Sequence, residues 1–169
     1  GGHRVGIAGE IPKDREGITG IKYISFMNIR VAHEKKGCAE KILPFLKDGE
    51  SIYNTLLVSK PGAGKTTCLR DCIRSLSNGK EGWEGMKICV VDERSEIAAC
   101  HLGIPQNDMG IRTDVLSGCG KSEGMMLMLR SMSPQIIAVD ELGGKKDFQA
   151  VEQAACSGVR ILGTVHADT

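Results

Sequence analysis

Hydrophobic and polar residues are arranged in two different ways along the chain, and the change falls near residue 50. Before it, apolar stretches at 3–8 and 18–32 predict two strands, separated by a turn region with Pro12, Gly17 and Gly20. A helix is expected over about 37–47. These elements are too few to bury a core of their own, so residues 1–50 are interpreted as the remnant of an N-terminal domain.

After residue 50, short apolar runs alternate with amphipathic stretches. Helices are predicted over 65–77, 121–132 and 147–157, and strands from about 52 to the turn near residue 60, then over 86–91, 135–140 and 159–165. The segment from about 98 to 120 is predicted to be a long loop, a kind that usually carries function. The alternation predicts an α/β domain over 51–169, with a parallel sheet covered by helices on both faces. This domain is expected to continue beyond residue 169.

Composition narrows the class of protein. The 169 residues carry a formal net charge of +1, and the only basic runs are pairs, so no nucleic-acid partner is expected. Seven cysteines without a C-x-x-C pair favour a reduced, cytoplasmic protein. No apolar run is long enough to span a bilayer, and no signal peptide is visible.

The most specific motif is a glycine-rich turn between a predicted strand and a predicted helix. Its residues are Ser59, Lys60, Pro61, Gly62, Ala63, Gly64, Lys65, Thr66 and Thr67. In such a P-loop, backbone N–H groups and the helix N-terminus converge on phosphates, the lysine follows the β- and γ-phosphates, and the Thr66 hydroxyl suits Mg²⁺. The pattern has glycine at its first position, where this chain has Ser59. The motif predicts ATP and Mg²⁺ as ligands and a P-loop NTPase fold of the RecA-like (ASCE) kind.

A second signal is the apolar run that ends in Asp140 and Glu141. Ligands bind at the carboxyl ends of parallel strands, so both carboxylates are expected beside the P-loop. Asp140 is predicted to hold Mg²⁺ through its water shell, and Glu141 to orient and polarise the attacking water. The alternative is a pair of solvated acids that closes a buried strand.

The strand over 159–165 is followed by His166. P-loop ATPases with a catalytic glutamate generally insert one strand between the P-loop strand and the Asp-Glu strand, and this strand is the candidate. His166 would then sense the γ-phosphate, unless it is only a packed or exposed residue at a strand end.

The strand over 86–91 delivers another acidic pair, Asp92 and Glu93, followed by Arg94. Asp92 is predicted to contribute to nucleotide binding, Glu93 to share Mg²⁺ or position water, and Arg94 to touch phosphate. The alternative is a structural cluster that caps a helix, since acids favour a first helical turn.

These residues carry a family resemblance. The segments 91–98, 105–116, 123–126 and 130–134, with 2–9 at the start, closely resemble the stage III sporulation protein AA family of endospore-forming bacteria. More loosely, the chain is similar to the traffic ATPases of type II and type IV secretion. Their Asp box would map onto Asp92 and Glu93, their Leu-Arg-x-x-Pro-Asp run onto Leu129-Arg130 and Pro134-Gln135, and their His box onto 164–168. Gln135 replaces an acid of that pattern, and Asp140-Glu141 is a fuller pair than the usual Gly-Glu.

The resemblance implies a mother-cell ATPase that energises assembly of, or transport through, the channel between mother cell and forespore. It implies a hexameric ring that holds nucleotide between subunits, at the cytoplasmic side of the forespore-facing membrane, with membrane proteins of the channel as partners. Arginines reach the phosphates from the neighbouring subunit in such rings. Arg30 is the first candidate here, and the weaker ones are Arg4, Arg94, Arg112 and Arg130. A nucleotide-gated ring scaffold with little turnover is the alternative to a motor, and a DNA-stimulated motor is a weaker third reading.

Overall fold

The computed structural model describes residues 3–12, 20–31, 34–80 and 82–167. Contacts group the chain into two units, Gly1–His33 and Glu34–Thr169. The smaller unit is an antiparallel hairpin of β1 (Arg4–Glu10) and β2 (Tyr23–Arg30), with a register shift between Ala8 and Gly9. This confirms the expected hairpin, although Gly17 of the predicted turn and positions 18, 19 and 32 of the predicted 18–32 strand lie outside the described residues.

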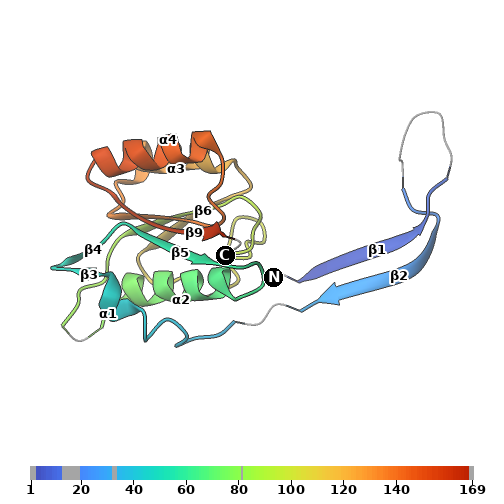
Figure 1. Ribbon diagram of the computed structural model, residues 1–169, viewed down its shortest axis with the longest axis horizontal. Helices are drawn as coiled ribbons and strands as arrows, with labels where there is room; N and C mark the ends of the chain where they lie inside the picture. Colours follow the sequence, from blue (N-terminus) through green and yellow to red (C-terminus); the bar gives the residue numbers. More distant parts are fainter. Residues whose placement is uncertain (1–2, 13–19, 32–33, 81, 168–169) are drawn as a thin grey trace. The chain divides into compact units, whose positions relative to one another are not determined.

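The larger unit is built on a five-stranded parallel sheet (Figure 1). Its strands, in spatial order, are β5 (Thr55–Ser59), β9 (Arg160–His166), β8 (Ile136–Val139), β6 (Ile88–Asp92) and β7 (Thr113–Ser117). The strand that ends at His166 lies between the P-loop strand and the Asp-Glu strand, which confirms the predicted insertion. Every residue of β6 and β8 is buried, as expected for strands with a layer on each face.

The edge strand β7 was not predicted, because it falls within the segment interpreted as a long loop. Within the described part of the chain it pairs with β6 only, from Thr113 opposite Ile88 to Ser117 opposite Asp92. Its sequence, Thr-Asp-Val-Leu-Ser, has two adjacent apolar residues and no alternation, and all five positions are half-buried. An edge strand in this position needs no continuous apolar run, so the hydrophobic pattern gave no signal.

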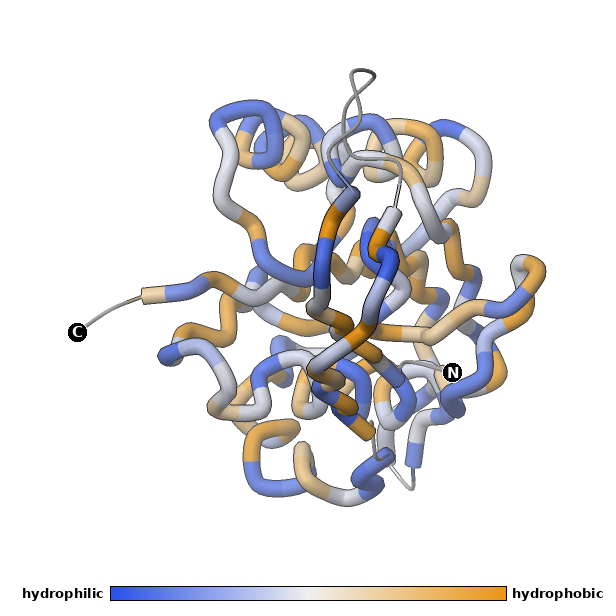
Figure 2. Tube along the Cα trace, turned by 90° about the vertical axis from the view of Figure 1, so that its right-hand side faces the viewer, coloured by the Kyte–Doolittle hydropathy of each residue, from blue (hydrophilic) through white to orange (hydrophobic). Residues whose placement is uncertain are grey.

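Helices cover both faces of the sheet, as predicted. Helix α2 (Lys65–Asn78) lies on one face, and α3 (Lys121–Met132) and α4 (Lys145–Cys156) lie on the other (Figure 1). Buried residues of α2 recur at helical spacing, at Leu69, Cys72, Ile73 and Leu76. Figure 2 shows hydrophobic positions, in orange, on many segments of the chain, and the residues of β8 and the first four of β6 are buried hydrophobic residues. Of the described residues, no helix has both the length and the apolar character needed to cross a membrane.

The segment before the sheet is less helical than expected. Within the predicted helix over 37–47, only α1 (Leu43–Leu46) is helical, and turns precede it. Pro44 stands at the start of this helix, a position that proline favours and that explains why the helix begins so late. A two-stranded ribbon of β3 (Lys47–Asp48) and β4 (Ser51–Ile52) follows. Ala39, Leu46 and Ile52 pack in the same core as α2, while the domain boundary near residue 50 stays a prediction.

Candidate functional site

The carboxyl ends of the parallel strands bring most of the predicted residues to one edge of the sheet. The P-loop follows β5, His166 ends β9, Asp140 and Glu141 follow β8, and Asp92 and Glu93 lie at the end of β6. These four strands are neighbours in the sheet, although they are far apart in the sequence. Ligand sites of α/β sheets form at this edge.

The P-loop has an open backbone cradle. Gly62 and Gly64 have φ angles of 78° and 92°, a region that L-residues with a side chain rarely adopt. A Cβ atom added to either glycine would meet no atom within 4 Å, so the space beside the loop is empty. Gly64 also stands at the N-cap of α2, where backbone N–H groups have no intrahelical partner. The loop therefore offers an anion the N–H groups at the start of the helix and the space that a phosphate requires.

Lys65 is held over the loop by the loop's own oxygens. Its side chain is largely buried, since the residue is 8% exposed. Its ammonium donates hydrogen bonds to the carbonyl oxygen of Ser59 at 2.6 Å and to that of Lys60 at 2.9 Å. The Ser59 hydroxyl lies 3.3 Å from the same ammonium. Serine at the first position of the motif thus supplies an additional oxygen to the lysine, which glycine would not.

A chain of hydroxyl and carboxylate groups links the P-loop helix to the Asp-Glu turn. The Thr66 hydroxyl donates to Asp140 Oδ2 at 2.6 Å, and the Thr164 hydroxyl donates to Asp140 Oδ1. Thr164 also accepts a hydrogen bond from the backbone N–H of Glu141 at 2.8 Å. The arrangement places an aliphatic hydroxyl and a carboxylate side by side, the hard oxygen ligands that suit Mg²⁺.

Sequence reasoning missed the part that Thr164 plays, because it treated this residue only as one position of a motif. Thr164 is 0% exposed and lies on β9, beside β8. A hydroxyl inside a buried parallel strand needs a hydrogen-bond partner. The threonine in the run Ile-Leu-Gly-Thr-Val was therefore the signal from which a polar contact with a neighbouring strand could have been predicted.

Glu141 is constrained at both its backbone and its carboxylate. Its φ of 53° is left-handed, which is uncommon for a residue other than glycine and is a kind of strain found at functional sites. Arg94 Nη1 lies 2.9 Å from one carboxylate oxygen, and His166 Nε2 lies 3.0 Å from the other. The hydrogen bond with His166, helped by the charge of Arg94 and opposed by partial burial, holds the pKa of Glu141 below its usual range.

Asp92 has a different environment from Asp140. It is 2% exposed, and its carboxylate accepts hydrogen bonds from the backbone N–H groups of Glu96, Ile97 and Ala98 at 2.9, 3.1 and 2.8 Å. Burial raises the pKa of this carboxyl above its usual range, against the effect of these bonds. The contacts favour a structural role for Asp92, although the carboxylate fixes a turn after β6 and does not cap a helix as the alternative had it.

Glu93 forms an ion pair with Lys121 at the start of α3, at 3.0 Å. A small hollow lies between this ion pair and the Asp-Glu turn after β8, and both line it. Its polar lining consists of Asp92, Glu93, Arg94, Glu96, Lys121, Asp140 and Glu141. Both acidic pairs therefore face one hollow, with Arg94 in it.

Other predicted residues lie elsewhere. Arg130 is exposed near the end of α3 that leads into β8, so it lies toward the opposite edge of the sheet from the P-loop. Arg112 lies 3.4 Å from the carbonyl oxygen of Ser77, near the far end of α2. Arg30 is exposed on the separate hairpin unit. The Arg4 side chain and Asp168 are outside what the structure describes.

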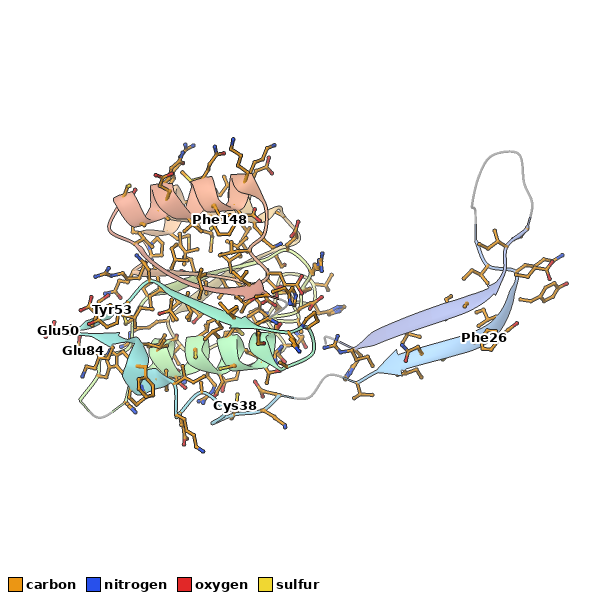
Figure 3. All side chains as sticks on the ribbon, in the orientation of Figure 1. Phe26, Cys38, Glu50, Tyr53, Glu84 and Phe148 are labelled. Carbon is orange, nitrogen blue, oxygen red and sulfur yellow. The ribbon has the colours of Figure 1, made fainter. Side chains whose placement is uncertain are left out.

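A larger hollow of this unit lies away from the site. It lies at the amino ends of the strands, and its lining includes Lys47, Trp83 and the labelled residues Glu50 and Glu84 (Figure 3). It contains no residue of the P-loop or of the two acidic turns. The chemistry of the P-loop edge, rather than the size of a hollow, therefore identifies the candidate site.

Comparisons with known proteins agree with this geometry. The family model for sporulation stage III protein AA matches residues 1–169. The chain is 47% identical over 166 residues to stage III sporulation protein AA of Bacillus subtilis, covering 98% of this chain and 54% of that protein. It is 34% identical over 128 residues to the uncharacterized protein ycf45 of Cyanidium caldarium, covering 73% of this chain and 36% of that protein. The chain thus spans about half, or less, of the length of these relatives.

A solved structure supports the fold. The X-ray structure of the Legionella pneumophila ATPase DotB superposes with a TM-score of 0.68 at 19% identity, covering 99% of this chain and 44% of that one. At this identity the likeness establishes the P-loop NTPase fold, and the family rests on the sequence matches. The chain belongs to the sporulation stage III protein AA family.

Proposed function

We propose that this protein binds ATP with Mg²⁺ at the P-loop edge and hydrolyses it. The observation that carries the proposal is the contact chain from Thr66 through Asp140 and Thr164 to the backbone of Glu141. It joins a phosphate cradle, a pair of oxygen ligands and a carboxylate base in one rigid group. A site that only bound phosphate would need the cradle and not the base.

The residues divide the chemistry among them. The N–H groups of the loop and the Lys65 ammonium bind the phosphates, with Ser59, Lys60, Pro61, Ala63 and Thr67 shaping the loop. Thr66 and Asp140, the latter through water, would hold Mg²⁺, which when bound neutralises charge on the β- and γ-phosphates. His166 lies at Glu141, where it would report the presence of the γ-phosphate.

Glu141 acts on the water. Its carboxylate accepts a proton as the water oxygen attacks the γ-phosphorus, and the bond from that phosphorus to the bridging oxygen of ADP breaks. The products are ADP and inorganic phosphate. Glu93, at the other side of the same hollow, would help to position the water through its ion pair with Lys121.

The assembly that we propose is a hexameric ring with nucleotide between subunits. Arg130 lies away from the P-loop of its own chain, so it would contribute to phosphate binding from a neighbouring subunit. Arg30, on the hairpin unit, is proposed for the same role by analogy with secretion ATPase rings, in which arginines reach the phosphates from the neighbour. The ring would act in the mother-cell cytoplasm, against membrane proteins of the channel to the forespore, and without nucleic acid. The family membership supports this setting.

The alternative is a nucleotide-gated ring scaffold with little turnover. One observation favours it: both oxygens of Glu141 are already paired, so the base is not free in this conformation. The two functions share ATP binding and assembly and differ only in turnover.

The test is ATP turnover as a function of protein concentration, with Mg²⁺ and with EDTA, beside binding of a fluorescent ATP analogue. A motor that shares its site between subunits gives turnover per subunit that rises with concentration and disappears with EDTA. A scaffold binds ATP and hydrolyses none at any concentration. The Lys65→Ala variant is the control and should lose binding in both cases. Equal binding by wild type and this variant would contradict the assignment of the P-loop.

A further inference from the structure

The Glu141 carboxylate is held by two groups that come from different strands. Arg94, in the turn after β6, takes one oxygen at 2.9 Å, and His166, at the end of β9, takes the other at 3.0 Å. Asp140 and the Thr164 hydroxyl fix the backbone beside it. A carboxylate engaged on both oxygens has fewer positions left to accept a proton from water.

The turn that carries Arg94 is fixed at its backbone. Its next residues are held by the buried Asp92 carboxylate, which accepts three backbone N–H bonds. From the other side, Arg70 of the P-loop helix donates at 2.6 Å to the carbonyl oxygens of both Glu96 and Ile97. The turn is therefore fastened between the sheet and α2, and it moves only if they move.

The Arg94 side chain, by contrast, is free to change partner. The side chain is 60% exposed, and its guanidinium pairs with Glu141. Near the surface an ion pair of this kind is weak, because water screens it and the side chain loses rotamer freedom. A phosphate group offers an arginine more charge and a bidentate acceptor, which is the stronger pairing.

We propose that Arg94 is a switch that responds to the γ-phosphate. When the P-loop holds no γ-phosphate, Arg94 pairs with Glu141 and keeps the carboxylate from the water. When ATP is bound, the guanidinium moves from Glu141 to the γ-phosphate, and the carboxylate is released for catalysis. Arg94 would therefore bind the γ-phosphate itself and, by leaving Glu141, free its carboxylate, and this inference rests on the proposed function above.

If Arg94 exchanges Glu141 for the γ-phosphate, substitutions of these two residues should be coupled in their effect on ATP binding and not in their effect on ADP binding. The test is a double-mutant cycle of Arg94→Ala and Glu141→Gln, read by equilibrium binding of fluorescent ATP and ADP analogues rather than by turnover. Arg94→Ala should weaken ATP binding about tenfold, the loss expected for one charge-assisted hydrogen bond, and leave ADP binding unchanged. Glu141→Gln should tighten ATP binding several-fold, because Arg94 then breaks no ion pair with a carboxylate when it moves to the γ-phosphate. That gain should vanish in the double variant.

Two further variants keep the test sharp. Arg94→Lys retains the positive charge but loses the planar guanidinium that binds a phosphate through two parallel hydrogen bonds. The ATP affinity of this variant should therefore fall between those of wild type and Arg94→Ala. Arg160→Ala is the matched control, since Arg160 forms a similar half-exposed pair with Asp48, at 3.1 Å, at the other end of β9. Arg160→Ala should change neither the affinity for ATP nor the affinity for ADP. Thermal unfolding of each variant checks that the fold is intact.

The outcomes separate the switch from the proposed function. If ATP binds and is hydrolysed, and the variants change ATP and ADP affinity equally or additively, Arg94 forms only a structural ion pair and the switch is wrong. If wild type binds no ATP, the proposed function fails and the switch fails with it. A coupling confined to ATP supports both.

Discussion

Two strands of the sheet end in the same two residues, aspartate then glutamate, and the structure uses the two pairs differently. After β8, the Asp140 carboxylate faces the hydroxyls of Thr66 and Thr164. At the end of β6, the Asp92 carboxylate faces three backbone N–H groups of the turn that follows. The first environment leaves oxygen ligands for a cation, and the second uses the carboxylate to hold the chain.

The difference comes from the neighbours of each strand. Strand β8 lies beside β9, which supplies a buried hydroxyl, and Thr66 of the P-loop helix reaches the same carboxylate. Strand β6 is followed by residues that turn back, so that their amides meet Asp92. Identical residue pairs therefore acquire different roles from the position of their strands in the sheet.

The largest expected effect separates the two glutamates. Glu141→Gln should lower ATP turnover about 10²- to 10⁴-fold, the usual contribution of a general base, while ATP still binds. Glu93→Gln should lower turnover less than about tenfold, because Glu93 is paired with Lys121 and only assists the water. Steady-state phosphate release measures both. Equal losses would show that the two acidic pairs share the chemistry, which would break the comparison.

The next effect separates the two aspartates by their use of Mg²⁺. Asp140→Asn should raise the Mg²⁺ concentration needed for half-maximal turnover about 10- to 100-fold, the range found when the surroundings of a metal are altered. Asp92→Asn should leave that concentration unchanged, because the carboxylate of Asp92 is occupied by backbone N–H groups. A Mg²⁺ titration at saturating ATP measures it. A shift in the Asp92 variant alone would reverse the two assignments.

The sequence predicted the part of this comparison that depends on order along the chain. The P-loop and the two acidic pairs follow from apolar runs that end in particular residues. The insertion of β9 beside β8 follows from the usual strand order of P-loop ATPases with a catalytic glutamate. The edge strand β7 was missed because half-buried Thr113–Ser117 has no distinctive pattern. The pairing of Arg94 with Glu141 and the contacts of Thr164 were also missed, since they join residues 47 and 23 positions apart. Contacts between residues on strands that are distant in the sequence can be predicted only after the order of the strands in the sheet is known.

The buried hydroxyl of Thr164 provides the third test. Thr164→Val keeps the shape of the side chain and removes the hydroxyl that bonds Asp140 Oδ1 and the Glu141 N–H, so the free energy of unfolding should fall by about 1–3 kcal/mol. Thr164→Ser retains the hydroxyl and is the control for the lost bonds. Urea unfolding measures both. A valine variant as stable as wild type would mean that this polar chain contributes nothing to the fold.

The smallest effect concerns the pH dependence of folding stability, to which Glu141 and Asp92 should contribute with opposite signs. The pKa of Glu141 is lowered in the folded protein, chiefly by its hydrogen bond with His166. Its contribution to stability is therefore present above the ordinary value of about 4.3 and is lost as pH falls.

The pKa of Asp92 is raised by burial, so its contribution is complete below the ordinary value of about 3.9 and is lost as pH rises through the folded value. From pH about 3.5 to 7, the stability of wild type relative to Glu141→Gln should increase, and that relative to Asp92→Asn should decrease. Urea unfolding of the three proteins across this range measures both slopes. Slopes of the same sign would mean that the two carboxylates share one kind of environment, which the hydrogen bonds around them contradict.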